Sequence, residues 1–424
     1  MPKARRHPRP ARHPAGDTGP ARAARRASTA GPGPRELFHS LAGDLADAET
    51  VFDAERMLST ILGMVYRIAE VRRAEAVTEF AEGLGHFARQ EGAVALWAAV
   101  DALLPELVPG RPDGDGPPWE PALAGVRPTG AYAYGDVYGD QVSYLATFAY
   151  ADEACGGPEH AVLALVDHNL GFAKDLFVSA PAAATLASVR ELASANPLIW
   201  YREVAPGELR AAVTALLANT DELIELPESE SLSSDRAFAL ARLALLPQPD
   251  QADHPPAGTA GPAEDRAALF KAFRASAAGR RLAGGGADPD SLDFCLDLIV
   301  EWAGERRDGR PLRWSPAAVE LFLLDWAPRA TVLDKADIAL LPQALDAWVA
   351  WAGRRCKLPA AAVRATREKI SAASPEFARL AASGEARGPA AQLVAEMLAE
   401  GVDLDDVDAV ERWVARHNAA TEAG

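Results

Sequence analysis

Four residues in the middle of the sequence have the types and spacing that acid–base chemistry or metal binding requires. Asp136 and Asp140 lie in the stretch YGDVYGD, and Asp167 and His168 begin the triplet DHN. Carboxylate oxygens bind divalent cations, and an imidazole titrates near neutral pH, where it can accept or donate a proton. If these four side chains converge, they form a candidate site for a hydrolase or a metal-dependent enzyme.

The same four residues also have a purely structural explanation. Asp and Asn start turns by accepting hydrogen bonds from nearby backbone N–H groups, and glycine adopts a positive φ without strain. Gly135 and Gly139 lie in the first stretch, and Gly171 follows the second. Because every residue type here is a common turn former, the sequence favours two turns over a reaction centre and leaves the catalytic role unknown.

Four strands are expected to position these turns. Residues 141–150 alternate between apolar and polar side chains, and residues 160–166 are apolar on both faces, as in a central strand. The short links between the runs predict an antiparallel meander whose first and third turns share one end of the sheet, about 10 Å apart. The predicted strands lie near residues 131–134, 141–150, 160–166 and 172–178.

Helices are expected on both sides of this sheet. Apolar residues at three- and four-residue spacings predict three or four helices within 35–104, with Thr50 or Asp47 as an N-cap. Further helices are predicted near 181–194, 206–219 and 235–246. The sequence therefore indicates a helical N-terminal region over 35–125 and an α+β domain with an antiparallel meander over 126–246.

The C-terminal part of the chain is predicted to be wholly helical. A Pro-, Gly- and Ala-rich linker over 247–264 precedes this domain, which covers 265–424. Ser315 caps a helix that ends just before Pro328, and another helix starts near Pro342. Six of the nine tryptophans lie here, which favours a large helical core over a ligand-binding box. The fold class is mainly α with a small α+β middle domain.

Charge is unevenly distributed along the chain and limits the class of partner. The formal net charge is −17, but residues 1–34 carry +7, residues 35–250 carry −19 and residues 265–370 carry +3. Residues 1–34 also lack apolar periodicity, which predicts a disordered basic tail. The acidic body makes a nucleic-acid partner unlikely except weakly through this tail. The basic run RRCKLPAAAVRATREK over 354–369 is best explained as a solvated helix face, with an anionic partner as the alternative.

Motifs of the major enzyme classes are missing from the sequence. It contains no G-x-S-x-G, H-E-x-x-H or G-x-x-x-x-G-K-[ST], so no cofactor and no metal are expected. Three widely spaced cysteines indicate free thiols in a reducing cytoplasm, and no apolar stretch is long enough for a membrane span. We expect a non-catalytic protein-interaction or regulatory module with a protein partner. The alternative is a hydrolase or metal-dependent enzyme that uses the Asp/His edge of the sheet.

Three stretches resemble uncharacterised proteins of high-GC actinobacteria: GDVYGDQVSYLATFAY, LVDHNLGFAKDLFV and WSPAAVELFLLDWAPR. The resemblance covers about residues 130–370 and is one of general texture. It implies a bacterial cytoplasmic protein, and it attaches no activity, ligand or catalytic residue to the chain.

Overall fold

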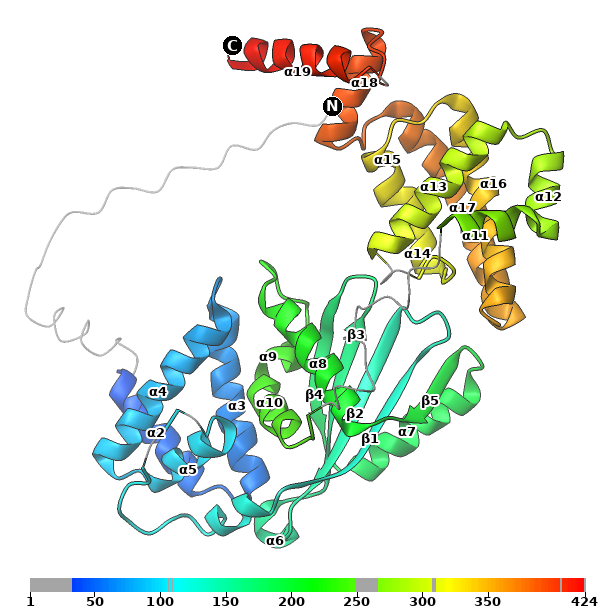
Figure 1. Cartoon of the computed structure of the whole chain (residues 1–424). Helices are drawn as coiled ribbons and strands as arrows, with labels where there is room; N and C mark the ends of the chain where they lie inside the picture. Colours follow the sequence, from blue (N-terminus) through cyan, green and yellow to red (C-terminus); the bar gives the residue numbers. More distant parts are fainter. Residues whose placement is uncertain are drawn as a thin grey trace, which may run out of the picture.

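The fold was analysed in a computed structural model. The structure describes residues 33–105, 107–108, 110–248, 266–306, 310–404 and 406–422. Nearly all of the predicted tail over 1–34 and of the predicted linker over 247–264 lies outside these residues. Figure 1 shows a sheet with helices on both sides, followed by a second group of helices.

Five strands form one antiparallel sheet in the described part of the chain, in the order β4-β3-β2-β1-β5. The sequence predicted only four. The missed strand follows α7 and pairs antiparallel with β1, where Asp136 faces Ile199. Its five residues are too few for a clear alternation, so they read as a loop between two helices. The strands are β1 (Arg127–Asp136), β2 (Gln141–Ala149), β3 (His160–Asp167), β4 (Phe172–Ser179) and β5 (Ile199–Glu203).

The two faces of the sheet are covered by different helices. Leu145, Leu163 and Val189 belong to a small core on the face that α7 covers, and α8 and α10 lie on the opposite face (Figure 1). The helices after the meander are α7 (Ala182–Ala195), α8 (Pro206–Asp221), α9 (Glu230–Ser234) and α10 (Arg236–Ala244); a short α6 (Glu153–Gly156) joins β2 to β3. These positions confirm the α+β character of the middle region.

The N-terminal helices pack onto the same core as the sheet. They are α2 (Pro34–Ala46), α3 (Val51–Ile68), α4 (Arg73–Glu91) and α5 (Val94–Leu103), followed by a 3₁₀ turn, η1 (Glu120–Gly125). Thr50 caps α3 as predicted, since its hydroxyl oxygen accepts a hydrogen bond from the Asp53 N–H at 3.2 Å. Leu58 of α3, Phe148 of β2 and Phe238 of α10 are fully buried in one hydrophobic cluster. The helical N-terminal region and the sheet therefore share a core.

Side chains from the neighbouring helices satisfy the outer edge of β4. The Val178 N–H donates to the Asp235 carboxylate at 2.8 Å. The Thr220 hydroxyl oxygen accepts from the Ala173 N–H at 3.0 Å and lies 3.1 Å from the Ala173 carbonyl oxygen. Asp235 and Thr220 are themselves buried, so these backbone groups are paired away from water.

The C-terminal helices build a second hydrophobic cluster of their own. Trp314, Phe322 and Trp348 are fully buried in it. The predicted helical core of aromatic residues is therefore present. Its elements are α11 (Arg266–Arg274), α12 (Ala277–Gly284), α13 (Pro289–Arg306), α14 (Pro316–Glu320), η2 (Leu321–Trp326), α15 (Ala327–Ala330), α16 (Lys335–Arg355), α17 (Ala360–Ser383), α18 (Pro389–Ala399) and α19 (Val407–Glu422).

Two helix boundaries in this region differ from the prediction. The helix capped by Ser315 does not end before Pro328, because the segment Leu321–Trp326 widens into a π-helical turn in which the Ala327 N–H reaches the Phe322 carbonyl. α16 starts at Lys335 and not near Pro342, since Asp334 caps it and accepts from the Asp337 N–H at 2.8 Å. In both cases the helix continues through the proline that predicts its boundary.

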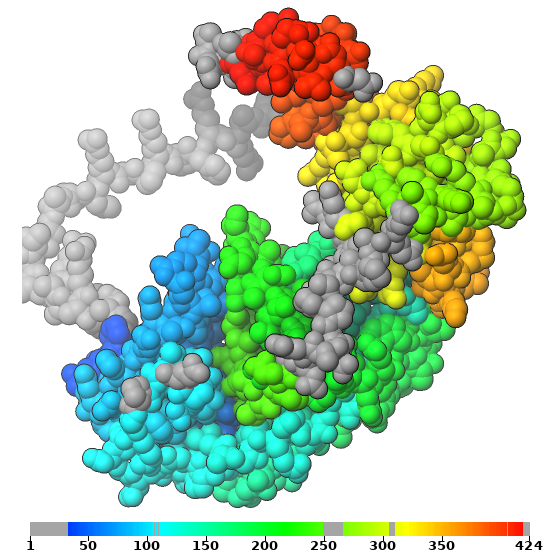
Figure 2. Space-filling view, viewed as in Figure 1, coloured from blue at the N-terminus to red at the C-terminus, as the bar shows by residue number. Residues whose placement is uncertain are grey.

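Figure 2 shows the N-terminal helices and the sheet as one mass, and the helices from α11 onward as another, with an open hollow between them. Within the described residues, no helix is both long and apolar enough to cross a membrane.

Candidate functional site

Asp136 organises the first predicted turn. One of its carboxylate oxygens accepts from the Tyr138 N–H at 2.8 Å and from the Asp140 N–H at 3.2 Å, and the other accepts from the Gln141 N–H at 2.7 Å. Gly139 has a φ of 74°, the conformation that glycine adopts most easily. Three accepted backbone hydrogen bonds hold the carboxylate in place and define the turn.

Asp167 does the same in the second turn. Its Oδ1 accepts from the N–H groups of Asn169 at 2.9 Å and Leu170 at 3.2 Å. Its Oδ2 accepts from the Gln141 side chain at 3.1 Å and lies 3.4 Å from the Lys174 ammonium group. Gly171 closes this turn with a φ of 76°.

The structure places the two turns side by side at one end of the sheet, as the meander predicted. Gln141 and Asp167 are direct partners in the pairing of β2 with β3, and the His168 N–H donates to the Asp140 carbonyl oxygen at 2.8 Å. All four predicted residues therefore lie at one sheet edge.

This edge forms the contact with the C-terminal helices. Tyr138, at the tip of the first turn, is 8% exposed and donates from its hydroxyl to the Ala362 carbonyl oxygen of α17 at 3.1 Å. Burial raises the pKa of Tyr138 above its ordinary value, so the hydroxyl keeps its proton and remains a donor. The Asp136 carboxylate thus shapes the turn that presents Tyr138 to α17.

The carboxylate oxygens at this edge are engaged within the protein. Among the described residues, no group of three or more His, Cys, Asp and Glu side chains is placed to hold a metal ion. The Asp136 oxygens and Asp167 Oδ1 accept from backbone N–H groups of the turns, and Asp167 Oδ2 contacts the side chains of Gln141 and Lys174. The structure therefore supports a turn-forming and domain-joining role for these carboxylates.

A second polar cluster, which we call the core network, joins α3, α10, β3 and Tyr150, the residue after β2. Arg242 donates to Glu55, with one bond of 3.0 Å between Nη1 and Oε1, and also to the Tyr150 hydroxyl. Tyr150 in turn donates to Glu55 at 2.6 Å. The His160 Nε2 accepts from Arg242 Nε at 3.0 Å, while its Nδ1 lies 3.1 Å from the Pro158 carbonyl oxygen. These contacts fix His160 as the Nδ1–H tautomer.

The protonation states in the core network are strongly shifted. Burial, with the adjacent Arg242 guanidinium, lowers the pKa of His160 to about 3. Burial also raises the pKa of Tyr150, and the pKa of Arg242 is raised by its contact with Glu55 against the opposing effect of burial. All four side chains belong to residues at most 5% exposed, so no substrate reaches them. The core network is structural.

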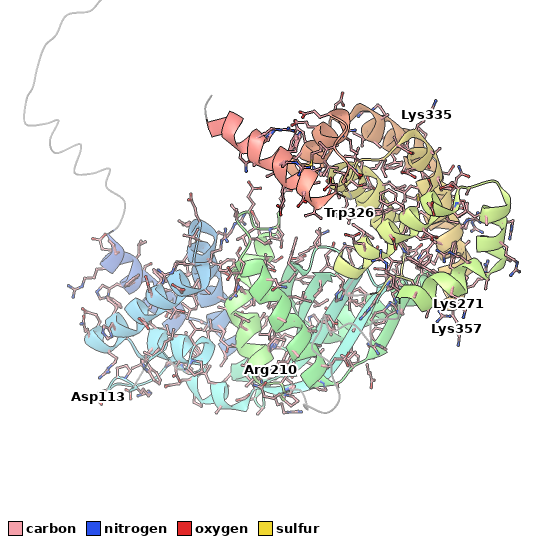
Figure 3. The ribbon with its side chains drawn as sticks, turned by 45° about the horizontal axis from the view of Figure 1, so that its top comes forward. Asp113, Arg210, Lys271, Trp326, Lys335 and Lys357 are labelled. Carbon is pink, nitrogen blue, oxygen red and sulfur yellow. The ribbon has the colours of Figure 1, made fainter. Side chains whose placement is uncertain are left out.

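An open groove lies along the C-terminal helices, between α12, α16 and α17. Its volume is about 1170 Å³. Leu282, Ala347, Ala350 and Val363 form part of an apolar floor. Figure 3 marks the two ends of α16 with Lys335 and Lys357, and the groove follows the half of α16 that ends at Arg354, near Lys357.

Arginine side chains line this groove. Arg281 comes from α12, Arg354 from the last turn of α16, and Arg364 and Arg367 from α17. Arg367 is already paired, because it donates two hydrogen bonds of 2.8 Å to Asp346 and thereby ties α17 to α16. Arg364 lies 3.8 Å from Glu368 in an exposed pair that contributes little. Within the described residues, Arg281 and Arg354 make no ion pair.

The local sequence explains how these helices frame a groove. Gly353 has no side chain where α16 meets Val363 of α17, and a Cβ there would approach Val363 to 2.5 Å. The turn between α16 and α17 places Lys357 at a φ of 56°, and the Leu358 N–H closes it on the Gly353 carbonyl oxygen at 2.8 Å. The two helices therefore meet closely at one end.

Part of the groove, but not the core network, could be predicted from the sequence. The basic run over 354–369 contains three of the groove arginines, but its one-dimensional pattern does not distinguish a rim from a solvated helix face. Arg281 lies outside the run and was missed. His160 is the first residue of β3 and belongs to the core network, in which Glu55 contacts residues 95 and 187 positions away.

No protein-family model matches the chain, and neither the curated proteins nor the solved structures contain a significant match to it.

Proposed function

We propose that this chain is a non-catalytic protein-interaction or regulatory module of the bacterial cytosol, and that the groove between α12, α16 and α17 is its docking surface. The observation that carries the proposal is that Arg281 and Arg354 line this open groove and make no ion pair within the described residues. Interfaces of this kind commonly place arginine around an apolar centre.

The cytosolic setting is part of the proposal and rests on the cysteines and on the actinobacterial resemblance. Cys155, Cys295 and Cys356 are all free thiols, as in proteins of a reducing compartment. Burial raises the pKa of Cys295 to about 12, which keeps it a thiol. None of the three needs a reactive role in a docking module.

The enzyme alternative, a hydrolase or metal-dependent enzyme at the Asp/His edge, has weaker support. Its two central carboxylates, Asp136 and Asp167, accept hydrogen bonds from their own turns. A cation that took these oxygens would have to displace those bonds. Titration calorimetry with Mg²⁺, Ca²⁺, Mn²⁺ and Zn²⁺ on the wild type and on Asp136→Asn tests this alternative, and we expect no binding.

The docking proposal is tested by affinity purification from an actinobacterial lysate with three forms of the full chain. They are the wild type, the groove variant Arg281→Glu/Arg354→Glu, and a control, Lys271→Glu/Lys335→Glu, which makes the same charge change on the same group of helices outside the groove. We expect one protein to co-purify stoichiometrically with wild type and control and to be lost with the groove variant. Identical co-purification by all three forms would contradict the proposal.

A further inference from the structure

The C-terminal segment Glu400–Asn418 has the properties that a ligand of the groove requires. It contains six acidic and two basic residues, a net charge of −4. Its apolar residues are not all covered: Leu404 is 41% exposed, Val407 67% and Val414 37%. Val407 and Val414 lie seven positions apart in α19 and therefore share one face of the helix. Exposed apolar side chains beside carboxylates are unusual for a helix that packs only within its own chain.

α19, which makes up most of this segment, packs against the end of α18 through a buried tryptophan. Trp413 is 3% exposed, donates to Glu400 at 2.8 Å and stacks on His417. Figure 1 shows α18 and α19 projecting from the C-terminal helices, away from α12. The Gly388 N–H donates to the Arg329 carbonyl oxygen at 3.0 Å, which fixes the start of α18 next to α15, so α19 does not reach the groove of its own chain.

The groove and this segment match in charge and in size. The groove lining has four arginines against Asp346 and Glu368, and its lining residues on α17 run from Ala360 to Ser374, about 21 Å at 1.5 Å per residue. The part of α19 inside the segment, Val407–Asn418, has 12 residues, about 18 Å. An amphipathic helix lying in an apolar groove is a common mode of recognition, with acidic side chains pairing with the arginines at the rim.

We propose that the groove binds the acidic segment Glu400–Asn418 of a second copy of this chain. The inference rests on the proposed function, because it assigns an occupant to the same docking surface. Groove and segment lie on different parts of the molecule, so each copy can offer one and accept the other. Contacts of this head-to-tail kind build rings or open chains in preference to a simple two-fold dimer.

The test measures the mass of the full chain by light scattering over a wide range of protein concentration. The groove variant Arg281→Glu/Arg354→Glu keeps an intact segment, and the segment variant Asp408→Lys/Glu411→Lys keeps an intact groove. We expect the mass of the wild type and of Lys271→Glu/Lys335→Glu to rise with concentration and that of each groove or segment variant to stay at one chain. An equimolar mixture of the two variants should form a heterodimer that grows no further, since one working contact remains.

A second measurement does not depend on association of the whole chain. A labelled peptide of residues 400–418 should bind the wild type, lose at least tenfold in affinity for the groove variant, and bind more weakly as salt is added. A wild type that stays a single chain at all concentrations and does not bind the peptide would overturn the inference, as would a mixture that gives no heterodimer.

The experiments distinguish a failure of the self-association proposal from a failure of the docking proposal. If neither the peptide nor a second copy binds while a lysate protein still depends on Arg281 and Arg354, the groove has a different occupant and only the self-association is wrong. If neither measurement depends on these arginines, both proposals fall.

Discussion

Arginine has opposite surroundings in the two halves of the molecule. In the core network, Arg242 is 2% exposed and contacts Glu55 of α3, His160 of β3 and Tyr150, which follows β2. In the groove, Arg281 and Arg354 are exposed and make no ion pair within the described residues. The same guanidinium thus fixes a fold where its partners are internal, and remains available for another molecule where they are not.

The difference teaches how to separate structural from binding residues without homologues. A shifted pKa alone would select His160 and Tyr150 as a functional site. Solvent exposure leads to the opposite conclusion. His160 and Tyr150, whose pKa values are strongly shifted, are buried in the core, whereas the arginines of the groove are exposed. We therefore expect substitutions to cost most stability at the buried arginine and least at the exposed ones.

Arg242→Ala should destabilise the protein most. It leaves the Glu55 carboxylate buried without its partner, which typically costs about 3–5 kcal/mol of unfolding free energy. Urea denaturation followed by circular dichroism measures the loss. Replacing both partners, in Glu55→Gln/Arg242→Met, should recover part of it because no charge is left buried. A single variant as stable as the wild type would show that Arg242 does not fix the core.

The core network should also make stability depend on pH. The pKa of His160 is about 3 in the folded protein and 6.5 in the unfolded chain. The unfolded state therefore binds one more proton between these values, so stability is full above pH 6.5 and falls by about 1.4 kcal/mol per unit as the pH is lowered through this window. Denaturation between pH 7 and 5, compared with His160→Gln, isolates this slope. Equal slopes would assign it to other groups.

A smaller effect is expected at the sheet edge that joins the two halves. Tyr138→Phe removes the hydrogen bond to the Ala362 carbonyl oxygen and should cost about 1 kcal/mol. Asp136→Asn keeps an acceptor oxygen for the turn and should cost a similar amount. We expect both variants to be cleaved between α10 and α11 by limited proteolysis earlier than the wild type. Unchanged cleavage would show that the turn does not hold the halves together.

The groove arginines should matter least for stability. Arg281→Glu/Arg354→Glu changes exposed side chains without an internal ion pair, so unfolding free energy should stay within about 0.5 kcal/mol of the wild type. Thermal melting checks this, with Lys271→Glu/Lys335→Glu as the matched control. A large loss of stability in the groove variant alone would show that these arginines stabilise the fold, as Arg242 does.

The sequence predicted the parts of the fold whose signals are local. The alternation in residues 141–150, the doubly apolar run at 160–166 and the cap at Thr50 all depend on neighbours within a few positions, and each lies where it was expected. The missed strand β5 was too short for a period to appear. The boundaries at Pro328 and Pro342 were wrong because the surrounding helix tolerates proline there.

The candidate sites show the limit of local reasoning more clearly. The turn residues Asp136 and Asp167 could be predicted because a turn depends on residues that are adjacent in the sequence. Nothing in sequence spacing relates Glu55 to Arg242, 187 positions apart, or Arg281 to Arg354. Those relations depend on which helix faces which, and that is decided by packing of the whole core.

The sealed edge of β4 has a consequence for how copies of this chain can meet. A strand at the border of a sheet normally invites another strand to add to it, which is the first step of uncontrolled β-aggregation. Here Asp235 and Thr220 already occupy the outward N–H groups of Val178 and Ala173. A neighbouring chain finds no free donors at these positions. Strand addition at these positions of the β4 border is therefore blocked.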